Sequence, residues 1–249
     1  MGQPTRVDVA LLAGQAFDPA TNVCVIVDVL RASSSIVTLL ERGCESVVAA
    51  ANVAQARQLK ERLPDHLLCG EEAGLPPDGF DYGNSPAEFS RLALTGKHAI
   101  LATSNGTRVL AAAGQSSPVV VVGCLLNRTA AARAAVNIAR ERGLRVAIVS
   151  SAEHGGGTFV LEDALGAGAI AESALRLPDT VPGDAARFAA DAFSHASSDI
   201  EAAVRSAYHS QELIDAGLGK DVAYCARVDV SHVTPILTPG EDGTLRLRG

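Results

Sequence analysis

The fold is decided by the stretch Val23-Cys24-Val25-Ile26-Val27-Asp28-Val29-Leu30-Arg31-Ala32-Ser33-Ser34-Ser35. An almost uninterrupted apolar run, Val23–Leu30, is followed by small polar residues and then by helical spacing over Ser34–Arg42. A strand that is apolar on both faces is typical of a parallel sheet covered by helices on both sides. This stretch therefore predicts a strand followed by a helix in an α/β fold.

The same alternation recurs on either side of this stretch. The further predicted strands are Ser46–Ala50, His66–Cys69, His98–Thr103, Val119–Cys124 and Arg145–Ser151. The further predicted helices are Val53–Leu63, Ala87–Leu94, Arg108–Ala113, Thr129–Arg142 and Leu161–Leu175. This order predicts a three-layer α/β/α fold with a largely parallel or mixed sheet, with two closely packed lobes as the alternative. We expect residues 1–249 to form a single domain.

The segment 178–216 has a different pattern from the rest of the chain. It predicts polar helices at Asp184–His195 and Ile200–Ala207 without an apolar strand between them, as in a helical insertion or cap. After this segment, β-type patterning predicts strands at Val222–Val230 and Val233–Thr238, and then a hairpin end at Thr244–Leu247.

The composition excludes several classes of protein. The chain has 21 Lys and Arg against 28 Asp and Glu, a net charge of −7, and only 4% aromatic residues. It therefore lacks the basic excess and the stacking side chains of a general nucleic-acid binder. No apolar run is long enough to span a membrane, and residues 1–8 lack the basic stretch and apolar segment of a signal peptide, so we expect a cytoplasmic protein. The five cysteines are odd in number and lie mostly in apolar runs, which predicts buried thiols in a cytoplasmic protein.

The junction after the first strand carries the residues best suited to phosphate chemistry. Asp28 is an acid near a strand end, Arg31 is a guanidinium, and Ser33, Ser34 and Ser35 lie at a helix start. Helix-start N–H groups, hydroxyls and an arginine together can hold a phosphate. In the alternative interpretation, Ser33 or Ser34 only caps the helix and Asp28 pairs with Arg31.

Three later junctions carry further candidates, because ligands of parallel sheets bind at the carboxyl ends of strands. Each also has a purely structural interpretation as a turn, a helix cap or a helix-dipole partner. The candidates are Glu71, Asn84 and Ser85 at the second junction, Ser104, Asn105, Gly106 and Thr107 at the third, and Glu153, His154, Gly155, Glu162 and Asp163 at the fourth.

Acids and hydroxyls without clustered cysteine or histidine suit Mg²⁺. We predict that Asp28 and Glu71, with Glu162 or Asp163, hold this ion. The six histidines show no zinc-ligand spacing, and His154 and His209 are candidate acid/base groups because polar residues flank them.

These motifs resemble, in the same order, those of the 2-phosphosulfolactate phosphatase (ComB) family. The matching stretches are Asp28–Ser35, Gly79–Pro86, Ser104–Thr107, Leu161–Ala169, Ser206–His209 and Gly219–Cys225. The resemblance covers nearly the whole chain. It implies an α/β fold and Mg²⁺-dependent hydrolysis of (2R)-phospho-3-sulfolactate to sulfolactate and phosphate, a step of coenzyme M biosynthesis.

Within this resemblance, Asp28 and Arg31 are the predicted catalytic residues, and the serines, Asn84, Ser85, residues 104–107 and residues 153–155 are the predicted phosphate ligands. The nucleophile is either a metal-activated water or Asp28 itself. The chain departs from the family at Glu72-Ala73-Gly74 and Ala152-Glu153-His154, where arginines are expected, and at Ser210, where a glycine is expected. Two alternatives follow: a phosphatase for another small phosphorylated acid, or a non-catalytic anion-binding homologue. The composition also allows a symmetric homodimer.

Overall fold

Strand β2 (Asn22–Val27) comes from the opening stretch and is buried along its whole length. The structure is a computed structural model that describes residues 3–12, 18–151, 157–240 and 242–249. Over these residues the strands form one ten-stranded sheet in the order β4-β5-β3-β10-β9-β6-β2-β7-β1-β8. The predicted α/β fold with a mixed sheet is therefore confirmed.

The other strands are β1 (Thr5–Ala10), β3 (Ser46–Ala50), β4 (Leu67–Gly70), β5 (His98–Ala102), β6 (Val119–Gly123), β7 (Arg145–Ser150), β8 (Thr180–Pro182), β9 (Ile236–Pro239) and β10 (Leu245–Arg248). The helices are α1 (Ala32–Glu41), α2 (Val53–Arg62), α3 (Pro86–Phe89), α4 (Gly106–Ser116), α5 (Arg128–Arg142), α6 (Leu161–Leu175), α7 (Asp184–Ala196), α8 (Ile200–Arg205), α9 (Tyr208–Asp215) and α10 (Gly219–Cys225). Short 3₁₀ turns at Pro19–Thr21, Leu125–Asn127 and Ser197–Asp199 connect some of these elements.

The sheet consists of two parallel halves joined by an antiparallel hairpin. Strands β4, β5 and β3 are parallel to one another, and so are β6, β2, β7, β1 and β8. The hairpin β9–β10 pairs antiparallel with both halves, so the strand sense reverses across it. Residues that follow β2, β4 and β5 nevertheless line one pocket.

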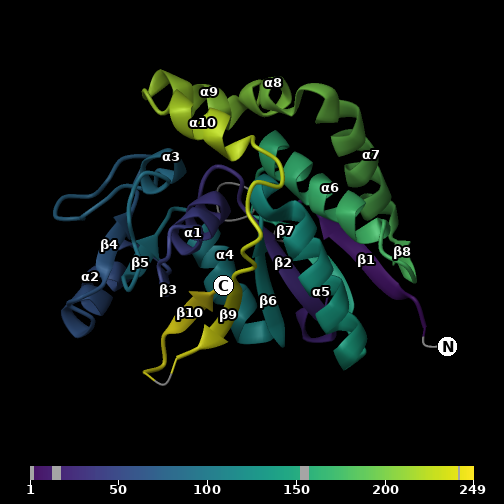
Figure 1. The fold of residues 1–249 in the computed structure, drawn as a ribbon, viewed down its shortest axis with the longest axis horizontal. Coiled ribbons are helices and arrows are strands. Elements are labelled where there is room, and N and C mark those ends of the chain that lie inside the picture. The colour runs from purple at the N-terminus through teal and green to yellow at the C-terminus, as the bar shows by residue number, and fades with distance from the viewer. Residues whose placement is uncertain (1–2, 13–17, 152–156, 241) are drawn as a thin grey trace.

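Helices cover both faces of the sheet (Figure 1). Helices α5, α6 and α7 pack on one face of β1, β2, β6 and β7, and α1 and α4 pack on the opposite face. Helix α2 covers β3, β4 and β5. Helices α8, α9 and α10, drawn in green to yellow, lie together at one edge of the molecule, where α10 contacts α3.

Several element boundaries differ from the sequence predictions. The predicted strand Val222–Val230 is wrong, because Gly219–Cys225 forms helix α10 with Val222 and Cys225, three residues apart, buried on one face. A short apolar run does not by itself distinguish the two periodicities. Strand β1 was missed, although its alternating burial follows Val7 and Val9, and so were the short strand β8 and the separate helix α9.

No helix among the described residues is long and apolar enough to cross a membrane. All five cysteines are buried free thiols, as predicted.

Candidate functional site

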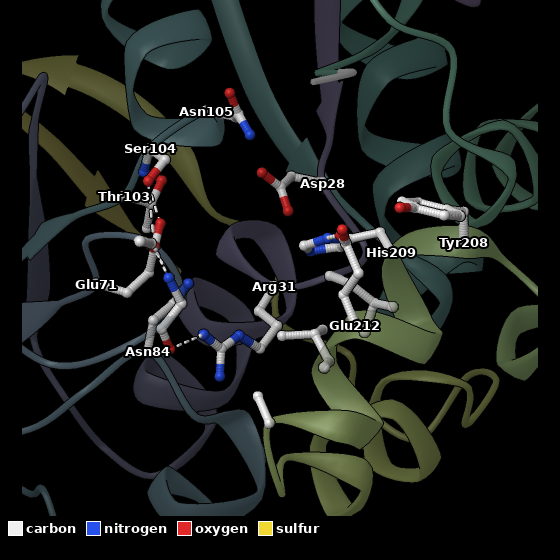
Figure 2. A pocket seen from close by; sticks show the side chains of 15 residues that line it. Asp28, Arg31, Glu71, Asn84, Thr103, Ser104, Asn105, Tyr208, His209 and Glu212 are labelled. Atoms are coloured by element: carbon white, nitrogen blue, oxygen red, sulfur yellow. Dashed lines mark hydrogen bonds and ion pairs between the residues drawn. The ribbon is translucent and has the colours of Figure 1, made fainter. Parts of the chain in front are cut away.

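A pocket of about 740 Å³ opens where the residues after β2, β4 and β5 face helix α9 (Figure 2). Its lining includes Asp28, Glu71, Ser104 and Asn105, which come from three separate junctions of the chain. The other described lining residues are Leu30, Arg31, Ala73, Gly74, Asn84, Thr103, Tyr208, His209, Glu212, Leu213 and Ala216.

Asp28 is the acid at the centre of this pocket, and only 6% of it is exposed. Its Oδ1 accepts a hydrogen bond of 2.9 Å from the backbone N–H of Ala32 at the start of α1. Burial raises the pKa of Asp28, while the hydrogen bond from Ala32 and the nearby charge of His209 act in the opposite direction. The carboxylate of Asp28 thus accepts a hydrogen bond at the start of α1, where the sequence predicted a bound phosphate.

The three serines after Arg31 lie inside α1, and their hydroxyls bond within the protein. Ser33 accepts from the backbone N–H of Asp28 at 3.0 Å, and Ser34 donates to the carbonyl of Val29 at 2.8 Å. Ser35 donates to Oδ1 of Asn84 at 2.5 Å. None of the three lines the pocket. The structure therefore does not bring them to the predicted phosphate position, and they support the Asp28 turn and Asn84 instead.

Glu71 and Ser104 connect the junctions after β4 and β5. Oε1 of Glu71 accepts from the backbone N–H of Ser104 at 2.6 Å, and Oε2 accepts from the backbone N–H of Gly74 at 2.8 Å. Asn105 precedes α4 and makes no side-chain cap hydrogen bond with it. Figure 2 shows its side chain directed toward Asp28.

Gly106 and Thr107 follow Asn105 in the first turn of α4 and do not line the pocket. A Cβ atom on Gly106 would lie 2.4 Å from Oδ2 of Asp28, so α4 approaches Asp28 closely because position 106 has no side chain. The hydroxyl of Thr107 bonds to the backbone of Thr103. Both residues support the pocket without facing a ligand.

Arg31 is held by a buried network that was not predicted from the sequence. Its Nη1 lies 3.0 Å from Oδ2 of Asp221 on α10, and its Nη2 donates to the carbonyl of Gly74 at 3.0 Å. The other oxygen of Asp221 accepts from the hydroxyl of Ser85 at 2.6 Å. Arg31 therefore pairs with Asp221, and the proposed pairing of Asp28 with Arg31 is not observed. Ser85, predicted as a phosphate ligand, lies outside this pocket and caps α3.

The fourth junction is only partly at the site. Asp163 and Glu162 are buried at the start of α6 and do not line the pocket, unlike Asp28 and Glu71. Asp163 accepts from the backbone N–H of Val29 at 2.7 Å, so it lies behind Asp28. Burial and the neighbouring charge of Asp28 raise the pKa of Asp163. Glu153, His154 and Gly155 lie outside the described residues.

Helix α9 contributes a wall of the pocket that was not predicted as such. Tyr208, Glu212 and Ala216 are spaced by four residues, and so are His209 and Leu213. A helix places residues with this spacing on one face. This four-residue spacing is visible in the sequence. Together with the interpretation of 178–216 as a cap, it could have predicted that one face of this helix lines the site.

The described lining carries more acid than base. Asp28, Glu71 and Glu212 are carboxylates, whereas Arg31 and His209 are the basic side chains among the described lining residues. With its mixed sheet and a pocket that carries charged side chains at the carboxyl ends of strands, the chain has the form of an α/β protein with a small-molecule site.

Comparison with known proteins assigns the family. A family model described as 2-phosphosulpholactate phosphatase matches residues 13–240. A protein of Deinococcus radiodurans named probable 2-phosphosulfolactate phosphatase is 39% identical over 90% of this chain and 92% of its own length. Proteins of the same name from Parasynechococcus marenigrum and Pseudothermotoga lettingae are 37% and 35% identical, over 88% and 86% of this chain and 90% and 89% of their own lengths. The chain belongs to the 2-phosphosulfolactate phosphatase family, as its motifs predicted.

Proposed function

We propose that this chain is a Mg²⁺-dependent phosphoric monoester hydrolase that converts (2R)-phospho-3-sulfolactate to 3-sulfolactate and phosphate. The observation that carries the proposal is the meeting of Asp28, Glu71 and the Ser104–Asn105 turn in one pocket, beside Arg31. Family membership supports the choice of reaction.

The charge of the pocket supports the metal. The proposed substrate carries phosphate, sulfonate and carboxylate groups, and three carboxylates among the described lining residues would repel it. A divalent cation between the acids and the phosphate would remove this repulsion. Mg²⁺ commonly binds through one or two carboxylates, substrate phosphate and water. Asp28 and Glu71 would supply the two carboxylates of that donor set. The described residues contain no group of three or more His, Cys, Asp or Glu that could hold a metal by themselves, so substrate phosphate and water would supply the other ligands.

In this proposal the protein's own residues bind and orient the substrate. Asp28 and Glu71 would hold the metal, which supplies charge neutralisation and polarisation of the phosphoryl group when bound. Arg31, fixed by Asp221 and Gly74, would bind an anionic oxygen of the substrate, and Asn105 and Ser104 would donate hydrogen bonds to others. Asp28 would act either as the nucleophile or as the acid that orients the attacking water.

Asp28→Asn tests the proposal directly. Asparagine retains an oxygen that can accept the Ala32 N–H hydrogen bond, so the variant should fold, but it lacks the charge needed for either role. We expect phosphate release from 2-phosphosulfolactate in the presence of Mg²⁺ to fall to background, as it should for the wild type in EDTA. Near-normal turnover by a folded Asp28→Asn protein would refute the assignment. Mass spectrometry of a trapped phosphoaspartate distinguishes the two nucleophiles.

A second candidate substrate is a smaller phosphorylated acid without a sulfonate. It is favoured by Ala73 and Gly74, which line the pocket where the family pattern led us to expect arginine. With fewer guanidinium groups there is less capacity to bind two further anions. Comparing kcat/KM for 2-phosphosulfolactate, phospholactate and phosphoglycerate decides between the two substrates. Binding of these acids without phosphate release would instead support a non-catalytic homologue.

We also propose a cytoplasmic location and a symmetric homodimer. Five buried free thiols are compatible with a reducing compartment. Light scattering on the purified protein tests the dimer.

A further inference from the structure

His209 lies in the first turn of α9 and lines the pocket on the side opposite Glu71. Figure 2 shows its ring directed toward Asp28. The side chain is 26% exposed, so it is accessible to a ligand without lying on the open surface. The sequence made this imidazole a candidate acid/base group, and the structure adds its place in the pocket.

Glu212 contacts the ring of His209 from one turn further along α9. Its Oε2 lies 3.3 Å from Nδ1 of His209. A carboxylate at Nδ1 orients an imidazole, and Nε2 is then the nitrogen that exchanges a proton with a ligand.

The helix that carries the pair is itself anchored. The hydroxyl of Ser210 is buried and donates to the carbonyl of Val204 at 2.6 Å, and Leu213 is 4% exposed. The backbone that carries the His209 ring is therefore packed against the rest of the protein, and these contacts set the position of the ring relative to Asp28.

The proposed reaction needs a proton donor, because its leaving group is an alkoxide, which departs poorly without a proton. Among the described lining residues, Arg31 stays protonated throughout and Asp28 and Glu71 are acceptors when ionised. Tyr208 is 80% exposed. His209 is the side chain of this lining whose ordinary chemistry matches proton donation near neutral pH.

We propose that His209 is the general acid of this site and that Glu212 is its positioning residue. This inference rests on the proposed phosphatase function. As the new bond to phosphorus forms from water or from Asp28, the bond between phosphorus and the ester oxygen breaks and its electron pair stays on that oxygen. The proton on Nε2 moves to the same oxygen, so the product leaves as an alcohol. His209 is left neutral and regains its proton from water.

The experiment compares two leaving groups in wild type and His209→Gln, with Mg²⁺ present. One substrate is 2-phosphosulfolactate, whose alkoxide needs the proton. The other is p-nitrophenyl phosphate, whose phenolate leaves without one. We expect kcat for the alkyl substrate to fall by about 10²–10⁴-fold, and kcat for the aryl substrate to change far less. An equal loss on both substrates would overturn the inference, since a lost binding or folding contact does not distinguish leaving groups.

Two further variants serve as a second test and a control. Glu212→Gln should show the same preference for the aryl substrate with a smaller loss, and no such preference would also count against the inference. His195→Gln removes an exposed histidine near the end of another helix, α7, and should leave both rates unchanged. A wild-type protein that hydrolyses neither substrate would refute the proposed function itself, an outcome distinct from an equal loss in His209→Gln.

Discussion

Gly106 is a residue at which α4 approaches Asp28 closely. It is the first residue of α4, and a Cβ there would lie 2.4 Å from Oδ2 of Asp28 and 2.6 Å from Cβ of Ala32. Gly106→Ala should therefore displace the carboxylate of Asp28 and lower kcat, since misplacement by about 1 Å can cost on the order of 10²-fold.

Gly219→Ala is the matched control for this prediction. Gly219 is also the first residue of a helix, α10, and a Cβ there meets only Ile214 at an ordinary 3.6 Å. We expect its phosphate release to equal that of the wild type. A Gly106→Ala protein with the same rate would show that the close approach to Asp28 has no catalytic consequence.

Asp221 is the second residue whose effect can be predicted from its contacts. It is 1% exposed and is the buried partner of Arg31, whose side chain is 4% exposed. Asp221→Ala leaves that guanidinium without its carboxylate, and breaking a buried pair in this way costs about 3–5 kcal/mol of the free energy of unfolding. Urea unfolding monitored by circular dichroism measures the loss.

An exposed pair provides the comparison. Arg176 bonds Glu172 with 70% of its side chain exposed, and Arg176→Ala should cost only about 0–1 kcal/mol. Similar costs for the two variants would mean that the Arg31–Asp221 pair is weaker than its burial suggests.

At the scale of elements, the hairpin β9–β10 joins the two halves of the sheet. Leu247 on β10 is fully buried between them, in the same apolar cluster as Val47 and Val120. Leu247→Ala should lower the free energy of unfolding by about 2–5 kcal/mol, because it removes buried methyl groups and leaves a cavity.

Leu75→Ala is the control for the hairpin prediction, since Leu75 is 60% exposed. Its unfolding curve should nearly coincide with that of the wild type. If Leu247→Ala also unfolds at the wild-type urea concentration, the hairpin is not an integral part of the sheet.

For the molecule as a whole, the burial of the five thiols predicts slow alkylation of the native protein. Burial raises the pKa of Cys44 to about 11 and that of Cys124 to about 11. The reactive form is the thiolate, so the native protein should resist iodoacetamide at pH 8 and take up five labels after unfolding. Mass spectrometry counts the labels, and rapid labelling of the folded protein would contradict the packing of these thiols.

The same pKa shifts determine how stability depends on pH. In the unfolded chain these thiols lose their protons at about pH 8.5, whereas Cys44 and Cys124 in the folded state have a pKa of about 11. The unfolded state then binds fewer protons, so the free energy of unfolding contributed by the thiols falls as pH rises through this window. Below pH 8 the contribution is fully present.

The sequence alone determined the α/β class, most of the strands and helices, and the family. These depend on local periodicity, turn residues and motif order, all of which are written along the chain. The stretch from Val23 to Ser35 already specified β2, the acid at its end and the start of α1. Element type was misread only where a short segment suits both periodicities, as at Val222–Cys225.

Tertiary structure alone decided which of the candidate residues share a pocket. Asp28 and Asp163 both follow apolar strands, yet only Asp28 lines the pocket, and Asp163 bonds to the backbone behind it. Arg31 could have paired with its near neighbour Asp28, but its partner is Asp221, 190 positions away. Such pairings depend on how the twisted sheet and helices α9 and α10 pack in space, and no local pattern in the chain encodes that packing.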